Sequence, residues 1–474
     1  MGLAVIVLSI VAGWFLARAL TAGAWAAPRW ASLLVEVSLG SLIGPGLVSV
    51  LFFGVAVAGG ASRVGALGVV GVVLAIGAGV WWKFTAVEGA PVASKKFPWA
   101  WVLWICVGVG LVFLVLDFQA ASSANPSGEW DAMSIWNLRA RYLASGGEMW
   151  HRALSSEIGG NMGGAQHPGY PLFLSGLIAT AWSAAGEFDQ TAPIGVSLVF
   201  AIGVLILLGA SVACRKSTAL GLLAWCVLLA SEVFASQAAV QYSDLLQGFA
   251  FLATIVLLDA ASERPGPRLW LAAGLAAGLA CWIKNEGIPF TVAALAVAVW
   301  RFRKRGLVWV GLGAAPGLLA VGALKLMAQG REGIFPHTVG EAVEKIAGAG
   351  RWWQAALGFG KAVYNAGNPW THPVVLIAVL ALALGFVPAA ERRARWWLWV
   401  PVAVTAAAEY SLYLVTTADL DWHISTSVSR LVAQLWPSLI WLVLVMLRTP
   451  EEFFAGPAAV AEVEGRKLGR RVRR

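Results

Sequence analysis

A succession of apolar runs, each about 18–22 residues long, constrains this chain more than any other feature. Such runs span a membrane as helices or as part of a closed barrel, because lipid offers the backbone no hydrogen-bond partner. The runs lack the strict alternation of barrel strands. Of 474 residues, 59% are hydrophobic and 12% are charged, about half the charged fraction of a soluble domain. We therefore predict an all-α, polytopic membrane protein.

We expect about thirteen transmembrane helices. They lie near residues 2–22, 31–58, 64–82, 98–117, 190–213, 218–235, 240–260, 268–283, 286–301, 306–327, 373–389, 396–415 and 431–448. No basic segment precedes the first run, so we expect a retained helix and not a cleaved signal peptide.

Basic residues in the short loops predict which helix ends face the cytoplasm. The clusters are Lys83 with Lys95 and Lys96, Arg215 with Lys216, Arg264 with Arg268, Arg301 with Arg303, Lys304 and Arg305, and Arg392 with Arg393 and Arg395. With all of them inside, the helices alternate without conflict. The chain is then a protein of the cytoplasmic membrane, with its N-terminus on the outer side and its C-terminus in the cytoplasm. The net charge of +9 is explained by this topology, and we expect no nucleic-acid partner.

Residues 168–186 are apolar enough to resemble another span. Counting them as one would move the later basic clusters outside. We therefore expect a juxtamembrane or re-entrant helix, whose start is broken by Pro168 and Pro171.

This topology divides the chain into five parts. They are N-terminal transmembrane helices at 1–97, a core at 98–327 with a first outer loop at 118–167, an outer segment at 328–372, C-terminal helices at 373–448 and a basic cytoplasmic tail at 449–474. Within the outer segment, residues 337–366 predict an amphipathic helix that lies across the interface and roofs a groove for a lipid. Most unusual polar groups fall on the outer face, and such groups near a membrane are usually retained for function.

The first outer loop predicts a short amphipathic helix over residues 125–143, lying on the membrane. Asp131 near its start has two interpretations, a helix N-terminal cap or a functional carboxylate. Trp130 and Trp136, taken alone, are typical of interfacial anchors.

Several short motifs follow one another in a fixed order: Trp130-Asp131-Ala132, the run from Trp136 to Arg141, His167-Pro168-Gly169-Tyr170, Tyr242-Ser243-Asp244, the run from Gly278 to Gly287, and the run from Trp422 to Ser427 that leads to Arg430. In this order and on a common face, they resemble the bacterial membrane glycosyltransferases of the GT-C superfamily. Those are relatives of protein O-mannosyltransferases and of aminoarabinose transferases that act on lipid A. The resemblance covers most of the chain from residue 98 onward.

The resemblance implies an enzyme that takes a sugar from a polyprenyl-phosphate carrier and passes it to an acceptor on the extracytoplasmic face. The acceptor would be a lipid, a glycan or a protein. Such enzymes invert the anomeric centre in one displacement. The absence of a Gly-rich phosphate loop on a βα unit agrees with a donor that is not a soluble nucleotide sugar.

The resemblance matches Asp131 to the family's catalytic carboxylate, the base for the acceptor hydroxyl, with Glu129 as a rival. Positive charge for the departing phosphate would come from Arg430, Lys284 and His423. The sugar and the acceptor would bind a larger set of polar and aromatic groups, namely Asp244, Glu286, His167, Tyr170, Trp136 and Asn137.

Each assignment has a structural alternative. Lys284 and Glu286 are also typical of a helix end at the interface, Arg430 of a helix anchored to headgroups, and His167 of a cap before Pro168. Many lipid-linked transferases of the resembled type carry a second acidic pair in a later outer loop, which helps to bind a metal or the acceptor. We find no adjacent Asp-Asp or Asp-Glu pair of this kind here, and Asp419 with Asp421 is the nearest match. Neutralisation of the phosphate by Arg and Lys is sufficient, so we expect no metal or other cofactor.

Two other functions remain open. An oligosaccharide ligase or polymerase shares the many-helix body but uses a diphosphate-linked donor. A transporter or flippase predicts paired charges deep in the membrane and an internal repeat. The sequence has scattered candidates for such charges, Glu36, Glu232, Lys325 and Glu409, and no repeat.

Overall fold

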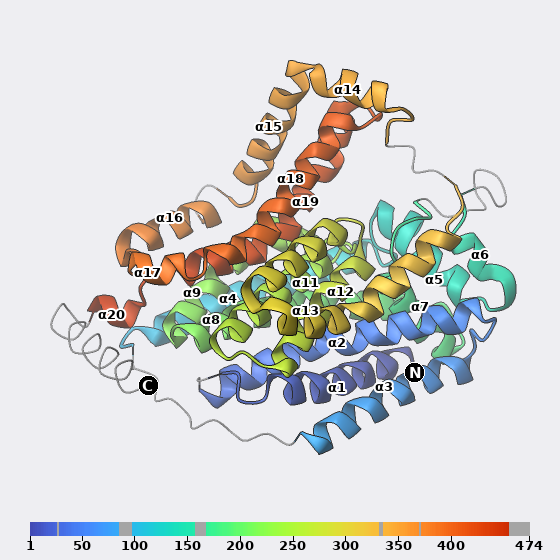
Figure 1. Cartoon of the computed structure of the whole chain (residues 1–474), viewed down its shortest axis with the longest axis horizontal. Coiled ribbons are helices and arrows are strands. Elements are labelled where there is room, and N and C mark those ends of the chain that lie inside the picture. The colour runs from blue at the N-terminus through green and yellow to red at the C-terminus, as the bar shows by residue number, and fades with distance from the viewer. Residues whose placement is uncertain (26–27, 85–96, 157–166, 331–334, 369–370, 455–474) are drawn as a thin grey trace.

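The computed structural model describes residues 1–25, 28–84, 97–156, 167–330, 335–368 and 371–454. Within them the chain is helical, with two isolated β-bridges and no strand, so the all-α prediction is confirmed (Figure 1). The longer helices are α1 (Gly2–Thr21), α2 (Arg29–Val57), α3 (Arg63–Lys83), α4 (Ala100–Ala124), α8 (Thr191–Arg215), α11 (Asp244–Glu263), α12 (Pro267–Ile283), α13 (Gly287–Met327), α15 (Ala349–Tyr364), α18 (Trp399–Val415) and α19 (Leu420–Leu444). The shorter ones are η1 (Ala132–Trp136), α5 (Asn137–Ala144), η2 (Gly147–Met149), α6 (Trp150–Ala153), α7 (Phe173–Ala185), α9 (Thr218–Leu229), α10 (Glu232–Ala238), α14 (Val339–Ala347), α16 (Pro373–Leu384), α17 (Ala389–Arg393), η4 (Trp396–Leu398) and α20 (Pro450–Phe454).

Nine helices in the described part of the chain are long and apolar enough to cross a membrane. The number becomes ten if α9 and α10, bent by 70° at their junction, count as one span. The polytopic membrane architecture is thus confirmed, while the number thirteen stays a prediction. α7, α12 and α16 are apolar but shorter.

The 41-residue α13 reverses its direction within the bundle. A straight helix would place Asn285 and Lys325 about 60 Å apart at 1.5 Å per residue, yet Lys325 Nζ lies 2.8 Å from Asn285 Oδ1. The turn occurs at Arg303, whose backbone leaves helical geometry at φ 62° and ψ −162°. α13 is therefore two antiparallel helices, which match the predicted spans at 286–301 and 306–327.

Basic residues from several loops gather at one end of the bundle, which we call the basic end. Arg215 and Arg395 share Asp259 and Glu263. Arg264 and Arg268 donate to backbone carbonyls just beyond and within the end of α1. The turn of α13 lies here too, because Trp300 packs on Trp396 and Phe302 on Trp397. The loops predicted to share the cytoplasmic side thus lie together; Lys95, Lys96 and residues 455–474 of the predicted tail lie outside the described residues.

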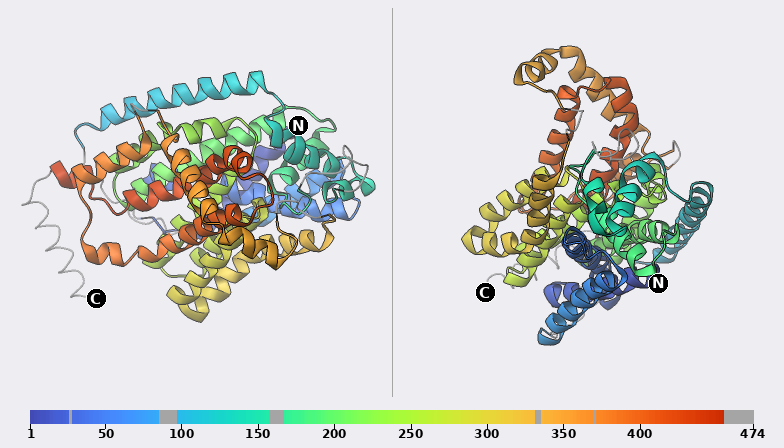
Figure 2. Two further views of the ribbon diagram at one scale, coloured as in Figure 1. Left: turned by 90° about the horizontal axis from the view of Figure 1, so that it is seen from above. Right: turned by 90° about the vertical axis from the view of Figure 1, so that its right-hand side faces the viewer.

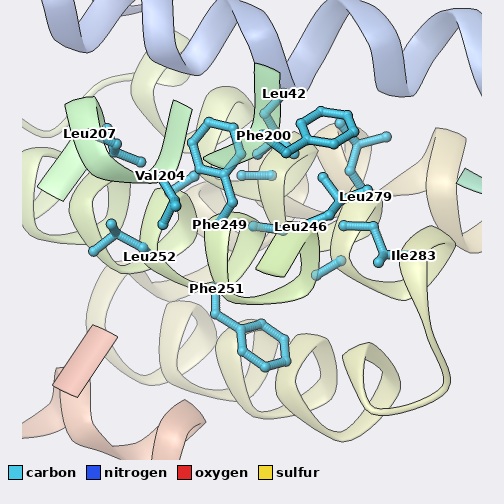
Figure 3. Packing of buried hydrophobic residues seen from close by; sticks show 14 of the residues in the cluster. Leu42, Phe200, Val204, Leu207, Leu246, Phe249, Phe251, Leu252, Leu279 and Ile283 are labelled. Carbon is cyan, nitrogen blue, oxygen red and sulfur yellow. The ribbon is translucent and has the colours of Figure 1, made fainter. Parts of the chain in front are cut away.

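α11 runs through the middle of the molecule, and its side chains form the centre of the hydrophobic core. Figure 3 shows its Leu246, Phe249 and Leu252 among side chains of α2, α8 and α12. Phe251 points the other way and stacks on Phe290 of α13, with ring centroids 4.0 Å apart. Burial on every side explains why this segment is apolar all round instead of amphipathic.

Glycines set the closest helix contacts. A Cβ on Gly317 of α13 would lie 1.9 Å from Gly278 O of α12, and one on Gly44 of α2 would lie 1.8 Å from Ser9 O of α1. Backbones approach this closely only where no side chain intervenes. The pairs Gly274 with Gly278 and Gly313 with Gly317, each four residues apart, therefore form one interlocked crossing.

The predicted helix after Pro168 and Pro171 exists as α7, which begins at Phe173. Twelve of its thirteen residues, all but Ala185, are buried, because α1, α2, α3 and α5 pack around it. α7 therefore does not lie on the bundle surface, and burial among helices satisfies its apolar character on all sides.

The first outer loop also folds into the bundle. Its predicted helix is a π-helical turn, η1, continued by α5, which packs on α7. Trp136 and Ala140 are fully buried, whereas Trp130 and Met133 are exposed. The interpretation of Trp136 as an interfacial anchor is thus wrong, because its side chain packs on protein; that the helix lies on the membrane stays a prediction.

The predicted amphipathic helix over residues 337–366 is two helices, α14 and α15, separated at Gly348. With the adjoining parts of α18 and α19 they stand out from the other helices in Figure 1 and in the right-hand view of Figure 2. Only Ala355 and Gly358 of these two helices are buried. Arg351 fastens α15 to α18 by donating to Tyr413 O and Thr416 O, both at 3.0 Å.

The glycine crossing of α12 and α13 predicts a position-dependent loss of stability. Gly317→Ala forces a methyl group against the α12 backbone and should destabilise the fold by about 1–3 kcal/mol. Gly311→Ala, on the same helix with nothing within 4 Å of its Cβ position, is the matched control. Thermal unfolding in detergent should show a lower Tm for the first variant only; equal values would contradict the close approach.

Candidate functional site

Asp244, at the first position of α11, is the centre of a buried ion-pair network. Its side chain is completely inaccessible to solvent. Oδ1 accepts from Lys284 Nζ at 2.8 Å and from Gln434 Nε2 at 2.7 Å, and Oδ2 lies 3.0 Å from Arg430 Nη2. A carboxylate at a helix N-terminus is further favoured by the helix dipole. Asp244 therefore joins the α12–α13 turn to α19.

Arg430 extends the network to the first outer loop. It lies inside α19, and its Nη1 donates to Asp131 Oδ2 at 2.6 Å while its Nε donates to Asp244. The guanidinium also stacks over the ring of Tyr242, with its centre 4.5 Å from the ring centroid. Since 83% of its side-chain surface is covered (17% exposed), Arg430 is a bridge between two carboxylates and not a headgroup anchor.

Lys284 is the second bridge. It follows the last residue of α12, and its buried ammonium lies 2.8 Å from Asp244 and 3.0 Å from Glu286 Oε1. Burial alone would lower the pKa of Lys284, but the carboxylates of Asp244 and Glu286 hold that pKa above its usual value. The ammonium therefore stays charged across the neutral range. Lys284 does end a helix, as the structural alternative supposed, and in addition it pairs with both acids.

The network lies at the end of the bundle opposite the basic end. Asp244 and Asp259 are 15 residues apart on α11, or about 22 Å along its axis. The hydrocarbon core of a bilayer is about 30 Å thick. A slab that covers the apolar side chains between the two charged clusters therefore places the network near one of its faces.

Asp131 is positioned by its backbone and left partly open at its carboxylate. Its side chain makes no capping hydrogen bond to η1, so the cap interpretation is wrong. Its N–H donates to Tyr242 Oη at 3.2 Å, and burial of that phenol raises the pKa of Tyr242. The carboxylate is 21% exposed. Oδ2 is bound to Arg430, and Oδ1 carries no hydrogen bond within the described residues.

The predicted sugar-binding group divides into two sets. Glu286 and Asp244 belong to the network. Trp136 and Asn137 are buried and hold the Asp131 segment in place: Asn137 donates to Ser127 O at 3.1 Å and to Gln241 Oε1 at 2.9 Å.

His167 and Tyr170 join Trp136 in a stack of rings. The His167 and Tyr170 centroids are 4.8 Å apart, and those of Tyr170 and Trp136 are 5.9 Å apart. Tyr170 interacts electrostatically with Lys284, so the stack adjoins the network. His167 has a left-handed backbone at φ 52° and precedes a turn, not a helix; the cap interpretation of His167 is therefore wrong.

Three predicted residues or pairs are bound elsewhere. His423 lies two turns from Arg430 on α19 and pairs with Thr416 Oγ1 at 3.1 Å. Glu129 accepts from Asn125 Nδ2 at 2.7 Å. Asp419 caps α19 by accepting from the Trp422 N–H, and Asp421 accepts from Gln354. In the described part of the chain, no three His, Cys, Asp or Glu side chains are placed to share a metal ion.

Three members of the site were not assigned to it by the sequence analysis. Gln434, four residues after Arg430 and so on the same face of α19, binds Asp244. Lys325 donates to Gly169 O at 2.6 Å and to Asn285, which brings a third cation beside Lys284 and Glu286. Glu409 of α18 is 3% exposed and interacts electrostatically with Glu286, Lys284 and Asp244. The helical spacing of Gln434 from Arg430 was a usable signal; the other two contacts depend on packing.

A separate cavity of 840 Å³ lies away from the network, between α4, α9, α10 and α16. Its lining is mostly apolar, with Asp117 and Glu232 among the polar exceptions. No residue of the network lines it.

Comparison with known proteins gives no match: no family model, no curated protein and no solved structure is similar to this chain.

The ion pairs of the network predict that the effect of one substitution on stability depends on the other members. Lys284→Met removes a cation from two buried carboxylates and should cost up to about 3–5 kcal/mol of stability, the range for breaking a buried pair. Adding Glu286→Gln removes one uncompensated charge and should restore part of that loss. Thermal unfolding of the single and double variants measures both effects, and a double variant no more stable than the single one would contradict the Lys284–Glu286 pairing.

Proposed function

We propose that the chain is an inverting glycosyltransferase that moves a sugar from a polyprenyl-phosphate carrier to an acceptor on the extracytoplasmic side of the membrane. The observation that carries the proposal is the Asp131–Arg430–Asp244–Lys284 chain of contacts. It combines a partly open carboxylate with two fixed cations at one edge of the apolar slab. A lipid-linked phosphate has its head at that depth and its chain in the slab.

The acceptor hydroxyl needs a base, and Asp131 fits that role. Its Oδ1 is free of hydrogen bonds within the described residues, and its Oδ2 is oriented by Arg430. The hydroxyl oxygen bonds to the anomeric carbon while its proton passes to Asp131, and the bond from that carbon to the phosphate oxygen breaks. A positioned base of this kind contributes about 10²–10⁴-fold in rate.

The departing phosphate gains negative charge in the transition state, so it requires cations that are already in place. Arg430 has five N–H groups and spends two in hydrogen bonds to Asp131 and Asp244. Lys284 pairs with Asp244 and Glu286, and Lys325 is hydrogen-bonded to the adjacent Asn285. Because the carboxylates of Asp131, Asp244 and Glu286 hold Arg430 and Lys284 in place, these two cations need not reorganise as charge develops.

A ligase with a diphosphate donor would use the same groups, and donor preference separates the two activities. A transporter or flippase is the second candidate, because interhelical ion pairs exist at both ends of α11. Between these pairs the core around α11 is closed by packed apolar side chains (Figure 3). The transferase therefore accounts for the site better.

The proposal predicts loss of transfer in Asp131→Asn. This variant keeps the shape of the side chain but cannot take a proton, so transfer should fall at least about 100-fold. The assay follows label from radiolabelled polyprenyl-phosphate sugars to membrane acceptors, with equal amounts of folded protein.

Glu129→Gln is the matched control, since Glu129 lies two residues away and outside the network; it should retain most activity. Equal transfer by wild type and Asp131→Asn would refute the base assignment. Transfer from a diphosphate-linked donor but not from a monophosphate-linked one would favour the ligase.

A further inference from the structure

α4 is attached to the bundle at both ends and packs loosely between them. It runs along the outside of the bundle (left-hand view of Figure 2), and only three of its 25 residues are buried. Near the basic end, Trp104 packs on Trp30 at the start of α2, with ring centroids 6.5 Å apart. At the network end, in the loop that follows α4, the Glu129 N–H donates to Val240 O at 3.2 Å. The middle of α4 therefore borders open space.

The cavity of 840 Å³ lies in this space. α4 lines it with one face, whose members recur at helical spacing: Cys106, Gly110, Phe113, Asp117 and Ala121. The opposite wall comes from α9, α10 and α16 and is also mostly apolar. The volume is within the range of about 300–1,000 Å³ found for ligand sites. An apolar cavity beside a membrane-spanning helix suits the hydrocarbon chain of a lipid.

Two carboxylates interrupt the apolar lining, Asp117 of α4 and Glu232 at the first position of α10. Within the described residues, neither side chain makes a hydrogen bond or an ion pair. No Lys, Arg or His from the described part of the chain lines the cavity. The lining thus carries two acids and no cation.

Asp117 lies at the depth of the membrane. It is 16 residues, or about 24 Å, from Trp101 at the other end of α4. Trp101 is exposed, as is typical of a residue at the membrane interface. Because the hydrocarbon core is about 30 Å thick, Asp117 falls inside the slab, near its network end. A carboxylate at this depth is costly unless a cation or hydrogen-bond donor meets it.

We propose that this cavity binds a membrane lipid whose head carries an ammonium group, as in phosphatidylethanolamine. Its acyl chain lies along the apolar lining, and its ammonium donates N–H groups to Asp117 and Glu232. Charge complementarity selects this occupant. The phosphate of an anionic lipid would meet two carboxylates and no cation, and a trimethylammonium head has no N–H to donate.

The lipid site is separate from the proposed donor site, because no residue of the network lines the cavity. It adds a second ligand of opposite head charge to the one proposed at Arg430 and Lys284. The inference does not depend on sugar transfer, so binding is the quantity to measure.

Two native cysteines report on the cavity. Cys106 and Cys226 line it, whereas Cys214 and Cys281 do not. The whole chain in detergent is alkylated with N-ethylmaleimide, and peptide mass spectrometry follows each thiol. Phosphatidylethanolamine at about ten times its Kd leaves about one site in eleven open, so alkylation of the exposed Cys106 should slow about 10-fold. The rate at Cys214 should not change.

Head-group controls use the same concentration of phosphatidylcholine or phosphatidylglycerol. If each binds at least about 10-fold more weakly, protection of Cys106 should be about 2-fold or less. Equal protection by phosphatidylglycerol and phosphatidylethanolamine overturns the proposal, because the cavity would then bind any acyl chain. Protection by a polyprenyl phosphate in place of phosphatidylethanolamine also overturns it and assigns the cavity to the carrier chain.

A protein variant tests the two carboxylates. Asp117→Asn combined with Glu232→Gln keeps the side-chain shapes and removes both charges, so the affinity for phosphatidylethanolamine should fall at least about 10-fold, as expected for lost hydrogen bonds to charged groups. Glu187→Gln removes an exposed acid that does not line the cavity and should leave protection unchanged. The buried Cys281 should stay unreactive in every variant that is folded.

Full protection of Cys106 by phosphatidylethanolamine in the folded double variant would refute the role of the carboxylates. Sugar transfer and lipid protection are measured independently. A wild type that transfers no sugar but shows the head-group preference therefore refutes the transferase alone, and the reverse result refutes the lipid site alone.

Discussion

The burial of Asp244 is the constraint on which the rest of the site depends. A carboxylate with no solvent access must have its charge balanced by the protein, and here Lys284 and Arg430 do so from two different helices. Each cation then reaches a second carboxylate, Glu286 or Asp131. The requirement to neutralise one buried charge thus fixes the relative positions of α11, α12, α13, α19 and the first outer loop.

The all-α, polytopic character of the chain and most network members could be predicted from the sequence. Apolar runs locate the helices because lipid leaves the backbone few alternatives, and abrupt polar interruptions such as Lys284-Asn285-Glu286 mark the site. The sequence could not show that Trp136 is buried, because an aromatic residue suits both an interface and a core. Nor did it separate α14 from α15, whose junction is the non-helical backbone of Gly348.

The residues that the sequence did not assign to the site were missed for a common physical reason. Lys325 reaches the network only because α13 turns back at Arg303, and Glu409 reaches it only because α18 lies antiparallel to α19. Periodicity within one segment contains no information on either relation. Charge alone was also ambiguous: Glu409 and Lys325 had been grouped with Glu36 and Glu232 as scattered candidates, whereas Glu36 in fact pairs with Arg18 near the basic end.

The 299-residue separation between Asp131 and Arg430 has a consequence for biogenesis. The chain emerges from the ribosome in order, so α11 enters the membrane with Asp244 long before α19 supplies Arg430. During that interval Lys284 is the first cation to reach Asp244, and the outer loop has no fixed anchor for its carboxylate. Completion of the site therefore coincides with insertion of one of the last helices, and a chain truncated before α19 leaves the Asp131 carboxylate without its cation and Asp244 paired with Lys284 but not with Arg430.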